Sequence, residues 1–449
     1  MSKRYLIRTN ITPFEDPSYY DAIRGNVVRS NSGNLLFPQS IVRALMTDDD
    51  TEFVPINTHG TFSDEQVETF NADYDAFLIP LANAFRVSFM EELANMTSLV
   101  RRLYIPCVVI GIGFQGNLAG DISRGFAWAD TARDFCHAVL EKSAKIGLRG
   151  EITASFMDYL GFTRGKDYEI IGCPSLFLYG DDLPKPKELS LCSDVRIHVN
   201  SKVDLPQKWH TYLKQVCDVI PDHYYLPQNQ YELCAMYSGL PLAYFRPDLK
   251  RLPEYYPSDA GHQLYQENRV RGFFTAQSWL DFLREGNLNF GTRIHGNIAA
   301  VLAGIPAFIV APDSRVLELA EYHHIPHITM KDLDLEESIF ALLEDADFDS
   351  VLDGHTERFH TYLSFLKENG LDTIFDKEKN DAQIVFEQEN NTSSIVAKCP
   401  FDRKMETISF QKPLQPYRFL KGKDKRSAFR YRELFLAKRF VRKHILRRG

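Results

Sequence analysis

The first 175 residues alternate short apolar, β-rich runs with stretches in which apolar side chains recur at helical spacing. Such alternation is typical of βα units, whose strands form a parallel sheet with helices on both faces. The pattern predicts strands over 4–8, 52–56, 76–80, 106–112, 146–148 and 168–171. It predicts helices over 38–46, 63–71, 88–103, 129–142 and 150–160.

Local signals mark the ends of three of these helices. Ser63 and Ser88 each precede a Glu or Gln by three residues, the spacing of a capping box that satisfies free amides at a helix start. Gly161 is suited to end the helix before it, because glycine readily adopts the left-handed conformation of a helix C-terminus.

A polar, proline-marked segment over 178–191 separates this series from a second one, and we place a domain boundary there. The second series has candidate strands over 195–199, 242–245, 272–274, 288–290 and 307–310, and it ends near residue 346. Residues 347–369 are expected to form a helix that crosses back over the body. The sequence thus predicts α/β domains over 1–180 and 192–346, a helical and irregular extension over 347–420, and a tail over 421–449.

Composition limits the class of protein. The chain has 449 residues, of which 44% are apolar and 25% charged, as expected of a folded protein of two or three domains. Its seven cysteines include no C-x-x-C pair, which argues against a disulfide framework and against a zinc site. No signal peptide or membrane-spanning stretch is recognisable, so we expect a cytoplasmic protein.

The tail over 421–449 differs sharply in charge from the rest. It has 12 Lys and Arg against two acidic residues, a net charge of +10, so the remaining 420 residues carry −18 of the total of −8. Apolar residues recur among these bases at roughly helical spacing. The pattern favours two interpretations about equally: a helix on an anionic membrane surface at the inner face of the cell membrane, or a solvated helix packed on the acidic body. Nucleic acid is not expected, because no recognition motif accompanies the tail.

The richest stretch in candidate chemistry is Gly291-Thr292-Arg293-Ile294-His295-Gly296-Asn297, where a strand leads through a glycine-flanked turn into a helix. In an open α/β sheet such turns lie at the carboxyl edge, where ligands bind. The amides at the helix start favour an anion, and Arg293 can bind a carboxylate or phosphate through two nitrogens. His295 can exchange a proton near neutral pH. A histidine that only caps the turn is an equally favoured interpretation.

Two further segments come from the first series. Gly111, Gly113 and Gly116 follow a strand with the spacing G-x-G-x-x-G, but no acidic residue is placed to bind a ribose, so the glycines favour a turn at the cleft over a dinucleotide site. Arg149 is a second cation at the carboxyl end of a strand; an ordinary surface arginine is the alternative. No metal site is predicted, because Pro326 prevents His323 and His327 from sharing a helix face.

Taken in order, several motifs resemble those of the polysaccharide pyruvyltransferases. The most specific is Gly291–Gly296, followed by Ala299-Ala300, Gly304-Ile305-Pro306 and Asp313-Ser314-Arg315. The family often has Asp at the position of Asn34 and Lys at that of Arg315; the second exchange keeps the charge and the first removes an acid. The earlier matching motifs are Asn31-Ser32-Gly33-Asn34, Ile110-Gly111-Ile112-Gly113, Leu148-Arg149-Gly150-Glu151 and Gly172-Cys173-Pro174-Ser175-Leu176.

This resemblance implies two Rossmann-like domains facing a cleft, similar to the GT-B glycosyltransferases, with the donor site in the second. It implies transfer of pyruvate from phosphoenolpyruvate to hydroxyls of a sugar, in a polysaccharide or its lipid-linked precursor, as a cyclic ketal and without a further cofactor. His295 would be the general acid. The residues expected to bind phosphoenolpyruvate are Arg293, Arg149, Gly296 and Asn297, and those expected in cleft loops are Gly111, Gly113, Gln115, Asn34 and Arg315.

Two other functions compete with this one. The first is a glycosyltransferase or epimerase of similar build, which would bind a nucleotide sugar and ignore phosphoenolpyruvate. The second is a non-catalytic protein that binds a membrane surface through its basic tail, and it would release no phosphate with any acceptor.

Overall fold

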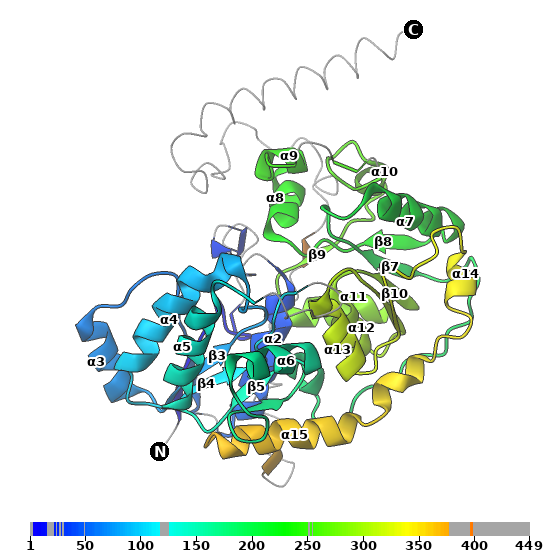
Figure 1. The fold of residues 1–449 in the computed structure, drawn as a ribbon. Coiled ribbons are helices and arrows are strands. Elements are labelled where there is room, and N and C mark those ends of the chain that lie inside the picture. The colour runs from blue at the N-terminus through cyan, green and yellow to red at the C-terminus, as the bar shows by residue number, and fades with distance from the viewer. Residues whose placement is uncertain are drawn as a thin grey trace.

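The structure is a computed structural model that describes residues 3–15, 22–23, 25–26, 28, 31–48, 50–116, 125–249, 252–253, 255–376 and 396–397. These residues form two α/β domains side by side, and a final helical segment returns to the first domain (Figure 1). The basic tail predicted over 421–449 lies outside the described residues, as does most of the extension beyond 376. No described helix is both long enough and apolar enough to span a bilayer.

Six parallel strands form the sheet of the first domain. Four pair in the order β2-β1-β3-β4, and a parallel bridge between Ile112 and Leu148 joins the pair β5-β6 to this edge. All six predicted strands are confirmed. Their bounds are β1 (Arg4–Ile7), β2 (Glu52–Pro55), β3 (Ala76–Pro80), β4 (Cys107–Ile110), β5 (Ile146–Leu148) and β6 (Tyr168–Ile170).

Alternation along these strands gives each face of the sheet its own hydrophobic core. Leu6 and Phe77 pack on one face with the helices α4, α5 and α6, while Tyr5 and Leu78 pack on the other with α2. The sheet is therefore covered on both faces, as a parallel sheet requires. The helices of this domain are α2 (Gly33–Leu45), α3 (Asp64–Asp73), α4 (Met90–Arg102), α5 (Ala129–Leu140) and α6 (Glu151–Leu160).

The helix ends confirm two of the three predicted signals. Ser63 forms the full capping box of α3, and Gly161 ends α6 in the left-handed conformation with φ of +94°. The capping box predicted at Ser88 is wrong. A 3-10 turn (Val87–Phe89) delays the start of α4 to Met90, and the Ser88 hydroxyl accepts a hydrogen bond from Nε of Arg86 at 3.1 Å instead.

The second domain has a five-stranded parallel sheet in the order β12-β11-β10-β7-β8. Its strands are β7 (Ile197–Asn200), β8 (His223–Tyr225), β10 (Leu288–Gly291), β11 (Ala307–Ala311) and β12 (His327–Thr329). Its helices are α7 (Gln207–Val219), α8 (Gln230–Ser238), α9 (Leu242–Phe245), α10 (Gln263–Gln266), α11 (Ala276–Arg284), α12 (Ile294–Leu302), α13 (Ser314–Tyr322) and α14 (Ile339–Leu342). The predicted α/β class with two Rossmann-like domains is confirmed.

Two predictions for this domain need correction. Residues 242–245, predicted as a strand, form the short helix α9 instead. Pro241 stands at its N-cap, and the backbone N–H of Arg246 closes the turn by donating to the carbonyl of Leu242. The predicted strand 272–274 is β9 (Gly272–Phe273), which lies outside the main sheet and pairs antiparallel with β13 (Val396–Ala397).

The chain returns to the first domain after α14, as predicted. Helix α15 (His355–Glu368) runs beneath both domains in Figure 1 and packs Phe359, Tyr362 and Phe365 into the core that contains Tyr5 of β1. This segment therefore fastens the end of the second domain to the first.

Both sheets reverse strand order at one point. In the first, β1 lies between β2 and β3; in the second, β7 lies between β8 and β10. Ligands of open α/β sheets bind outside the carboxyl ends of strands at such a switch point. The fold therefore indicates where a site should lie, between the carboxyl ends of these two strand pairs.

Candidate functional site

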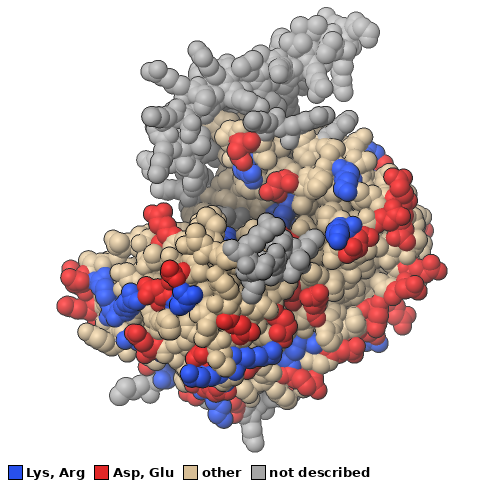
Figure 2. Space-filling view, in the orientation of Figure 1, with Lys and Arg blue, Asp and Glu red and all other residues tan. Residues whose placement is uncertain are grey.

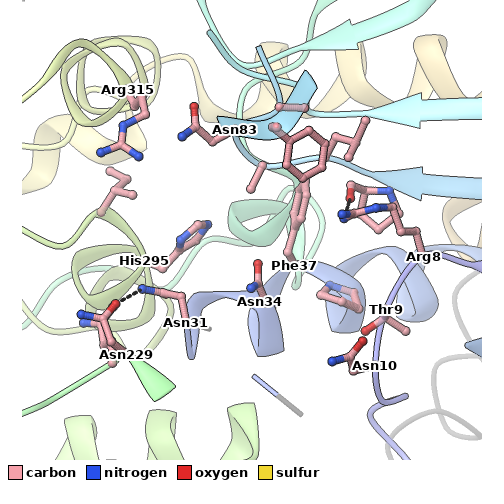
Figure 3. Close-up of a pocket in the computed structure, with 18 of the residues that line it drawn as sticks. Arg8, Thr9, Asn10, Asn31, Asn34, Phe37, Asn83, Asn229, His295 and Arg315 are labelled. Atoms are coloured by element: carbon pink, nitrogen blue, oxygen red, sulfur yellow. Dashed lines mark hydrogen bonds between the residues drawn. The ribbon is translucent and has the colours of Figure 1, made fainter. Parts of the chain in front are cut away.

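A cavity of about 660 Å³ lies where the two switch points meet (Figure 3). Its walls include the residues that follow β1 (Arg8, Thr9, Asn10) and β3 (Leu81, Ala82, Asn83). From the second domain they include Lys202, after β7, and Thr292 and Arg293, after β10. Strand ends of both domains thus contribute to one site.

The cavity is strongly cationic although the chain as a whole is acidic. Its lining contains six Lys and Arg and one carboxylate, Glu92, a balance of +5 in a chain of net charge −8. On the face shown in Figure 2, acidic side chains are spread along the outer rim of the second domain. Such a charge distribution favours a small anion in the cavity. The six cations are Arg8, Arg86, Arg149, Lys202, Arg293 and Arg315.

Arg149 of the first domain and Arg293 of the second both line the cavity, and both guanidiniums are buried. Arg149, directly after β5, is 3% exposed, and its Nε donates to the carbonyl of Gly111 at 3.0 Å. Arg293, at the N-cap of α12, is 9% exposed and donates from Nε to the carbonyl of Ser201 at 3.2 Å. One terminal nitrogen of each guanidinium is buried without a hydrogen-bond partner in the part of the chain that the structure describes. A buried unpaired donor of this kind is costly unless a ligand satisfies it.

His295 lies in the first turn of α12 beside these two cations. It is 8% exposed, and its Nε2 lies 3.8 Å from Sγ of Cys173 in the first domain. Burial, with the positive charges of Arg149 and Arg293, lowers the pKa of His295 to about 3. The imidazole is therefore neutral at neutral pH while no ligand is bound.

Close backbone contacts fix this turn. Gly291 has φ of +153°, and a Cβ there would lie 2.0 Å from the carbonyl oxygen of Asn200 in β7, so only glycine fits. The Asn200 side chain in turn accepts from the backbone N–H of Arg293 at 2.7 Å. Gly33 leaves room for the imidazole, since a Cβ there would lie 2.4 Å from Nδ1 of His295.

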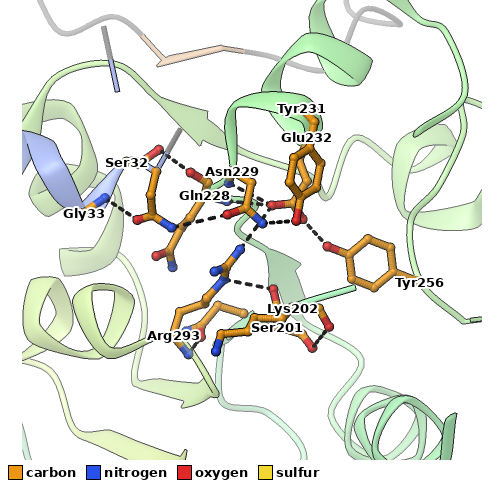
Figure 4. A network of polar contacts seen from close by, with 12 residues as sticks. Ser32, Gly33, Ser201, Lys202, Gln228, Asn229, Tyr231, Glu232, Tyr256 and Arg293 are labelled. Carbon is orange, nitrogen blue, oxygen red and sulfur yellow. Dashed lines mark hydrogen bonds and ion pairs between the residues drawn. The ribbon is translucent and has the colours of Figure 1, made fainter. Parts of the chain in front are cut away.

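A buried acid stands behind Arg293 (Figure 4). Glu232 is 3% exposed, and its Oε2 lies 3.7 Å from the same terminal nitrogen of Arg293 that has no hydrogen-bond partner, too far for a hydrogen bond but close enough for an ion pair. Glu232 also accepts hydrogen bonds from the hydroxyls of Tyr225 and Tyr256 and from the backbone N–H of Asn229. This network holds the carboxylate in place and leaves the Arg293 guanidinium only partly compensated.

A second ion-pair cluster lies at the rim. Asp313 accepts from two nitrogens of Arg315, at 3.0 and 2.6 Å, and from Nζ of Lys202 at 2.7 Å. Although burial opposes its ionisation, Arg315 and Lys202 hold the pKa of Asp313 well below its usual range. With its amide oxygen turned toward the cations, Asn83 accepts from Arg315 at 2.8 Å and from Arg86 at 2.7 Å.

Among the predicted site residues, the structure brings Arg149, Arg293, His295, Asn34 and Arg315 to the cavity. Gly111, Gly113 and Gln115 stand behind its wall. A Cβ on Gly111 would lie 2.9 Å from Phe37, and one on Gly113 would lie 2.7 Å from Cδ of Arg149, so these glycines make room for two lining side chains. The side-chain amide of Gln115 lies 3.1 Å from that of the lining residue Asn83.

Gly296 and Asn297 are not brought to the cavity, contrary to prediction. The Asn297 side chain is fully buried, donates to the carbonyl of Arg293 at 2.9 Å and accepts from Asn289 at 2.8 Å. A Cβ on Gly296 would lie 2.4 Å from the amide nitrogen of Gln228. Helical rotation is the reason, because the residues that follow His295 turn toward the protein interior.

Sequence reasoning missed several lining residues, above all Arg8, His59, Glu92 and Lys202. The rule that found Arg149, a cation directly after a strand, applies equally to Arg8, which follows β1. His59 and Glu92 are 33 positions apart in a loop and a helix, and no local pattern connects them.

Comparison with known proteins gives one family. The sequence model of the family described as polysaccharide pyruvyl transferase matches residues 18–314. No curated protein has a detectably similar sequence.

Similar solved structures have low identity. One is UDP-GlcNAc 2-epimerase of Methanocaldococcus jannaschii, at 9% identity and a TM-score of 0.41, covering 82% of this chain and 99% of that one. Another is sucrose-phosphate synthase of Thermosynechococcus elongatus, at 11% and 0.42, covering 82% and 98%. A third is MurG of Acinetobacter baumannii, at 10% and 0.30, covering 87% and 100%.

Proposed function

Because this chain belongs to the polysaccharide pyruvyl transferase family, we propose that it transfers the pyruvyl group of phosphoenolpyruvate to two hydroxyls of a sugar, forming a cyclic ketal. The acceptor is a sugar unit of a polysaccharide or of its lipid-linked precursor. The donor brings both the group to be transferred and the leaving phosphate, so the reaction needs no further cofactor.

The observation that carries the proposal is the pair of buried guanidiniums around His295. Phosphoenolpyruvate is a compact anion with a carboxylate and a phosphate, and it needs at least two cationic partners. Arg149 and Arg293 each keep a buried nitrogen without a hydrogen-bond partner among the described residues, and α12 begins at the same point. Guanidiniums and helix N-termini are the groups that best bind such oxyanions.

In this proposal His295 supplies the proton that starts the reaction. Its pKa of about 3 in the free protein is due to burial and to the two arginine charges. A donor anion bound between these arginines offsets their charge and favours the imidazolium. The imidazolium then protonates the methylene carbon of the donor, which makes the neighbouring C2 open to attack by a sugar hydroxyl.

The overall reaction balances without a redox step. Two C–O bonds form between sugar oxygens and C2, and the bond between C2 and the phosphate oxygen breaks. Two hydroxyl protons are released: one replaces the proton that His295 gave to the methylene carbon, and the other leaves with phosphate. The cavity of about 660 Å³ is within the usual range of ligand sites, roughly 300–1,000 Å³.

The first test measures phosphate release from phosphoenolpyruvate with a panel of galactosides, mannosides and N-acetylhexosamines. We expect release that depends on the acceptor. In the His295→Asn variant the rate should fall by about 10²–10⁴-fold with unchanged affinity for phosphoenolpyruvate, since general acids contribute about that factor. In Arg293→Met the dissociation constant should rise roughly 10- to 100-fold, the worth of a charged hydrogen bond.

Exposed Arg101, on the outer helix α4, provides the matched control, and Arg101→Met should keep wild-type kinetics and donor affinity. Binding of a nucleotide diphosphate sugar without phosphoenolpyruvate turnover would contradict the proposal in favour of a glycosyltransferase or epimerase. Full activity of His295→Asn would remove His295 from the mechanism.

A further inference from the structure

The end of the cavity opposite His295 contains polar chemistry that the donor does not use. In Figure 3, Arg8 lies across the cavity from His295, with Asn34 and Phe37 between them. This end is built by the first domain alone: Arg8 follows β1, His59 stands in the loop after β2, and Glu92 is in the first turn of α4.

Glu92 is the fixed centre of this group. It is 9% exposed; its Oε1 accepts hydrogen bonds from Arg8 and from the hydroxyl of Thr58, the latter at 3.0 Å. Arg8 is itself held, because its Nε donates to Thr58 at 3.0 Å and another nitrogen donates to the carbonyl of Pro80 at 3.3 Å. Burial opposes ionisation of Glu92, but the charge of Arg8 and its hydrogen bond outweigh it, and the pKa of Glu92 is lowered. The carboxylate is therefore ionised at neutral pH.

The second oxygen of Glu92 orients His59. Oε2 lies 2.8 Å from Nδ1 of His59, and the His59 side chain is 61% exposed in the cavity mouth. A carboxylate on Nδ1 fixes the proton on that nitrogen in the neutral imidazole, so Nε2 presents its lone pair. A carboxylate that orients a histidine in this way is the arrangement by which many enzymes hold a general base.

The fold does not need this contact. Arg8 already balances the Glu92 carboxylate, and an ion pair with a partner as exposed as His59 adds little stability. Two further cations lie near this end: Arg86, on the segment before α4, and Arg315 of the second domain, which contacts Asn83 together with Arg86. The Arg86 guanidinium lies 5.4 Å from the ring of Phe89, as does that of Arg8. His59 thus stands in the mouth among fixed side chains.

We propose that His59, oriented by Glu92, is the base that receives the proton of the acceptor sugar hydroxyl as its oxygen bonds to C2 of the pyruvyl group. This rests on the proposed function. The O–H bond breaks, its electron pair forms the new O–C2 bond, and the proton goes to Nε2 of His59. It leaves there to solvent or to the departing phosphate. The acceptor end of the cavity is thus formed by the loop over 57–62 and the segment over 86–92.

The test compares His59→Gln with the wild type in the phosphate-release assay, with a saccharide that the wild type uses. We expect the affinity for phosphoenolpyruvate, measured by calorimetry, to stay within twofold, and the acceptor-dependent rate to fall about 10²-fold or more. His360→Gln, an exposed histidine on α15, is the matched control and should keep the wild-type rate.

A His59→Ala variant adds a measurement that a structural role would not affect. Because the site is exposed, added imidazole should restore part of the lost rate in this variant and none in His295→Asn, whose pocket is buried. A His59→Gln rate within threefold of the wild type would overturn the proposal, and so would loss of phosphoenolpyruvate binding, which would place His59 in the donor site. Absence of release by the wild type with every acceptor would instead contradict the proposed function.

Discussion

Buried imidazoles in this protein show that a strongly shifted pKa does not by itself identify a site. Burial lowers the pKa of His198 to about 3 and that of His210 to about 4, much as for His295. Yet His198 packs against the rings of Tyr224 and Phe282, away from the cavity. What distinguishes His295 is that two guanidiniums lie beside it, each with a buried nitrogen that has no hydrogen-bond partner among the described residues.

His198 instead predicts how stability depends on pH. Its pKa in the folded protein, about 3, is below the unfolded value of about 6.5, so between these values the unfolded chain binds the extra proton. Stability therefore falls as pH falls from 6.5 toward 3. The single group contributes about 2 kcal/mol of loss between pH 7 and pH 5.

Replacing His198 by Leu should make the free energy of unfolding, measured by urea denaturation, less sensitive to acid by about that amount. The exposed His137, changed to Leu, is the control and should keep the wild-type slope. An unchanged slope in His198→Leu would mean that another group accounts for the acid sensitivity.

Among single residues, the sequence predicts the cations that follow strands but not the acidic side chains that pair with cations in the cavity. Arg149, Arg293 and His295 can be predicted because they lie shortly after a buried strand, where the next helix begins. Glu232 and Glu92 could not be found, since the contacts that define them join segments far apart in the sequence. Nothing local distinguishes these two acids from a surface glutamate.

Among the elements, α13 connects the two domains along its whole length. At its start the Ser314 hydroxyl bonds the backbone of Gly116 at 3.1 Å; in its middle Glu318 contacts α6; at its end the Tyr322 hydroxyl donates to the carbonyl of Ile170 at 3.0 Å. Immediately after it, His323 accepts from the backbone of Cys173 at 2.8 Å. The wall that carries Arg149 and Arg315 is therefore held rigidly across the domain boundary.

Glu318 supplies the cap that α6 lacks. The N-cap of α6 is Gly150, which has no side chain, and Glu318 from the other domain accepts the backbone N–H of Thr153 at 3.0 Å. Burial raises the pKa of Glu318 to about 7. Because this exceeds the unfolded value of about 4.3, ionisation costs stability as pH rises through 7.

Glu318→Gln keeps an acceptor for Thr153 but cannot ionise. Relative to the wild type it should be more stable at pH 8 by about 3 kcal/mol, with most of the difference gone at pH 5. Urea denaturation at the two pH values measures this. Glu344→Gln, an exposed site in the same domain, is the control; equal pH dependence of Glu318→Gln and wild type would contradict the raised pKa.

Elements marked by flanking turns and helices can be predicted from the sequence, even the three-residue strands β5 and β6, whereas elements without such marks cannot. The six strands of the first domain have flanking turns and helices that mark them. β8 and β12 have three residues each and escaped detection, and the apolar run Leu242–Phe245 has no length to distinguish a strand from the helix α9. Their form depends on neighbours in the folded domain.

At the scale of the whole molecule, the separation of charge predicts that the affinity for phosphoenolpyruvate depends on salt concentration. The cavity balance of +5 lies within a chain of −8. Screening shortens the reach of these charges, with a Debye length of about 10 Å at 0.1 M salt and about 3 Å at 1 M. The dissociation constant of phosphoenolpyruvate should therefore rise roughly tenfold from 0.05 to 0.5 M NaCl.

Calorimetry over that salt range measures the effect, and the KM of an uncharged saccharide acceptor, which should change little, is the control. A donor affinity independent of salt would mean that the distributed cations of the cavity do not contribute, and that direct contacts alone hold the anion.

The two ends of the cavity are built from different numbers of domains, and this difference affects which end can change in sequence more easily. The end of the cavity around His295 draws side chains from both domains, which α13 and the bridge between Asn31 and Asn229 hold together, so a change in either half disturbs the other. The end around His59 belongs to surface segments of one domain. If the proposed function holds, substitutions in those segments can therefore adapt the protein to another saccharide while the residues around His295 stay the same.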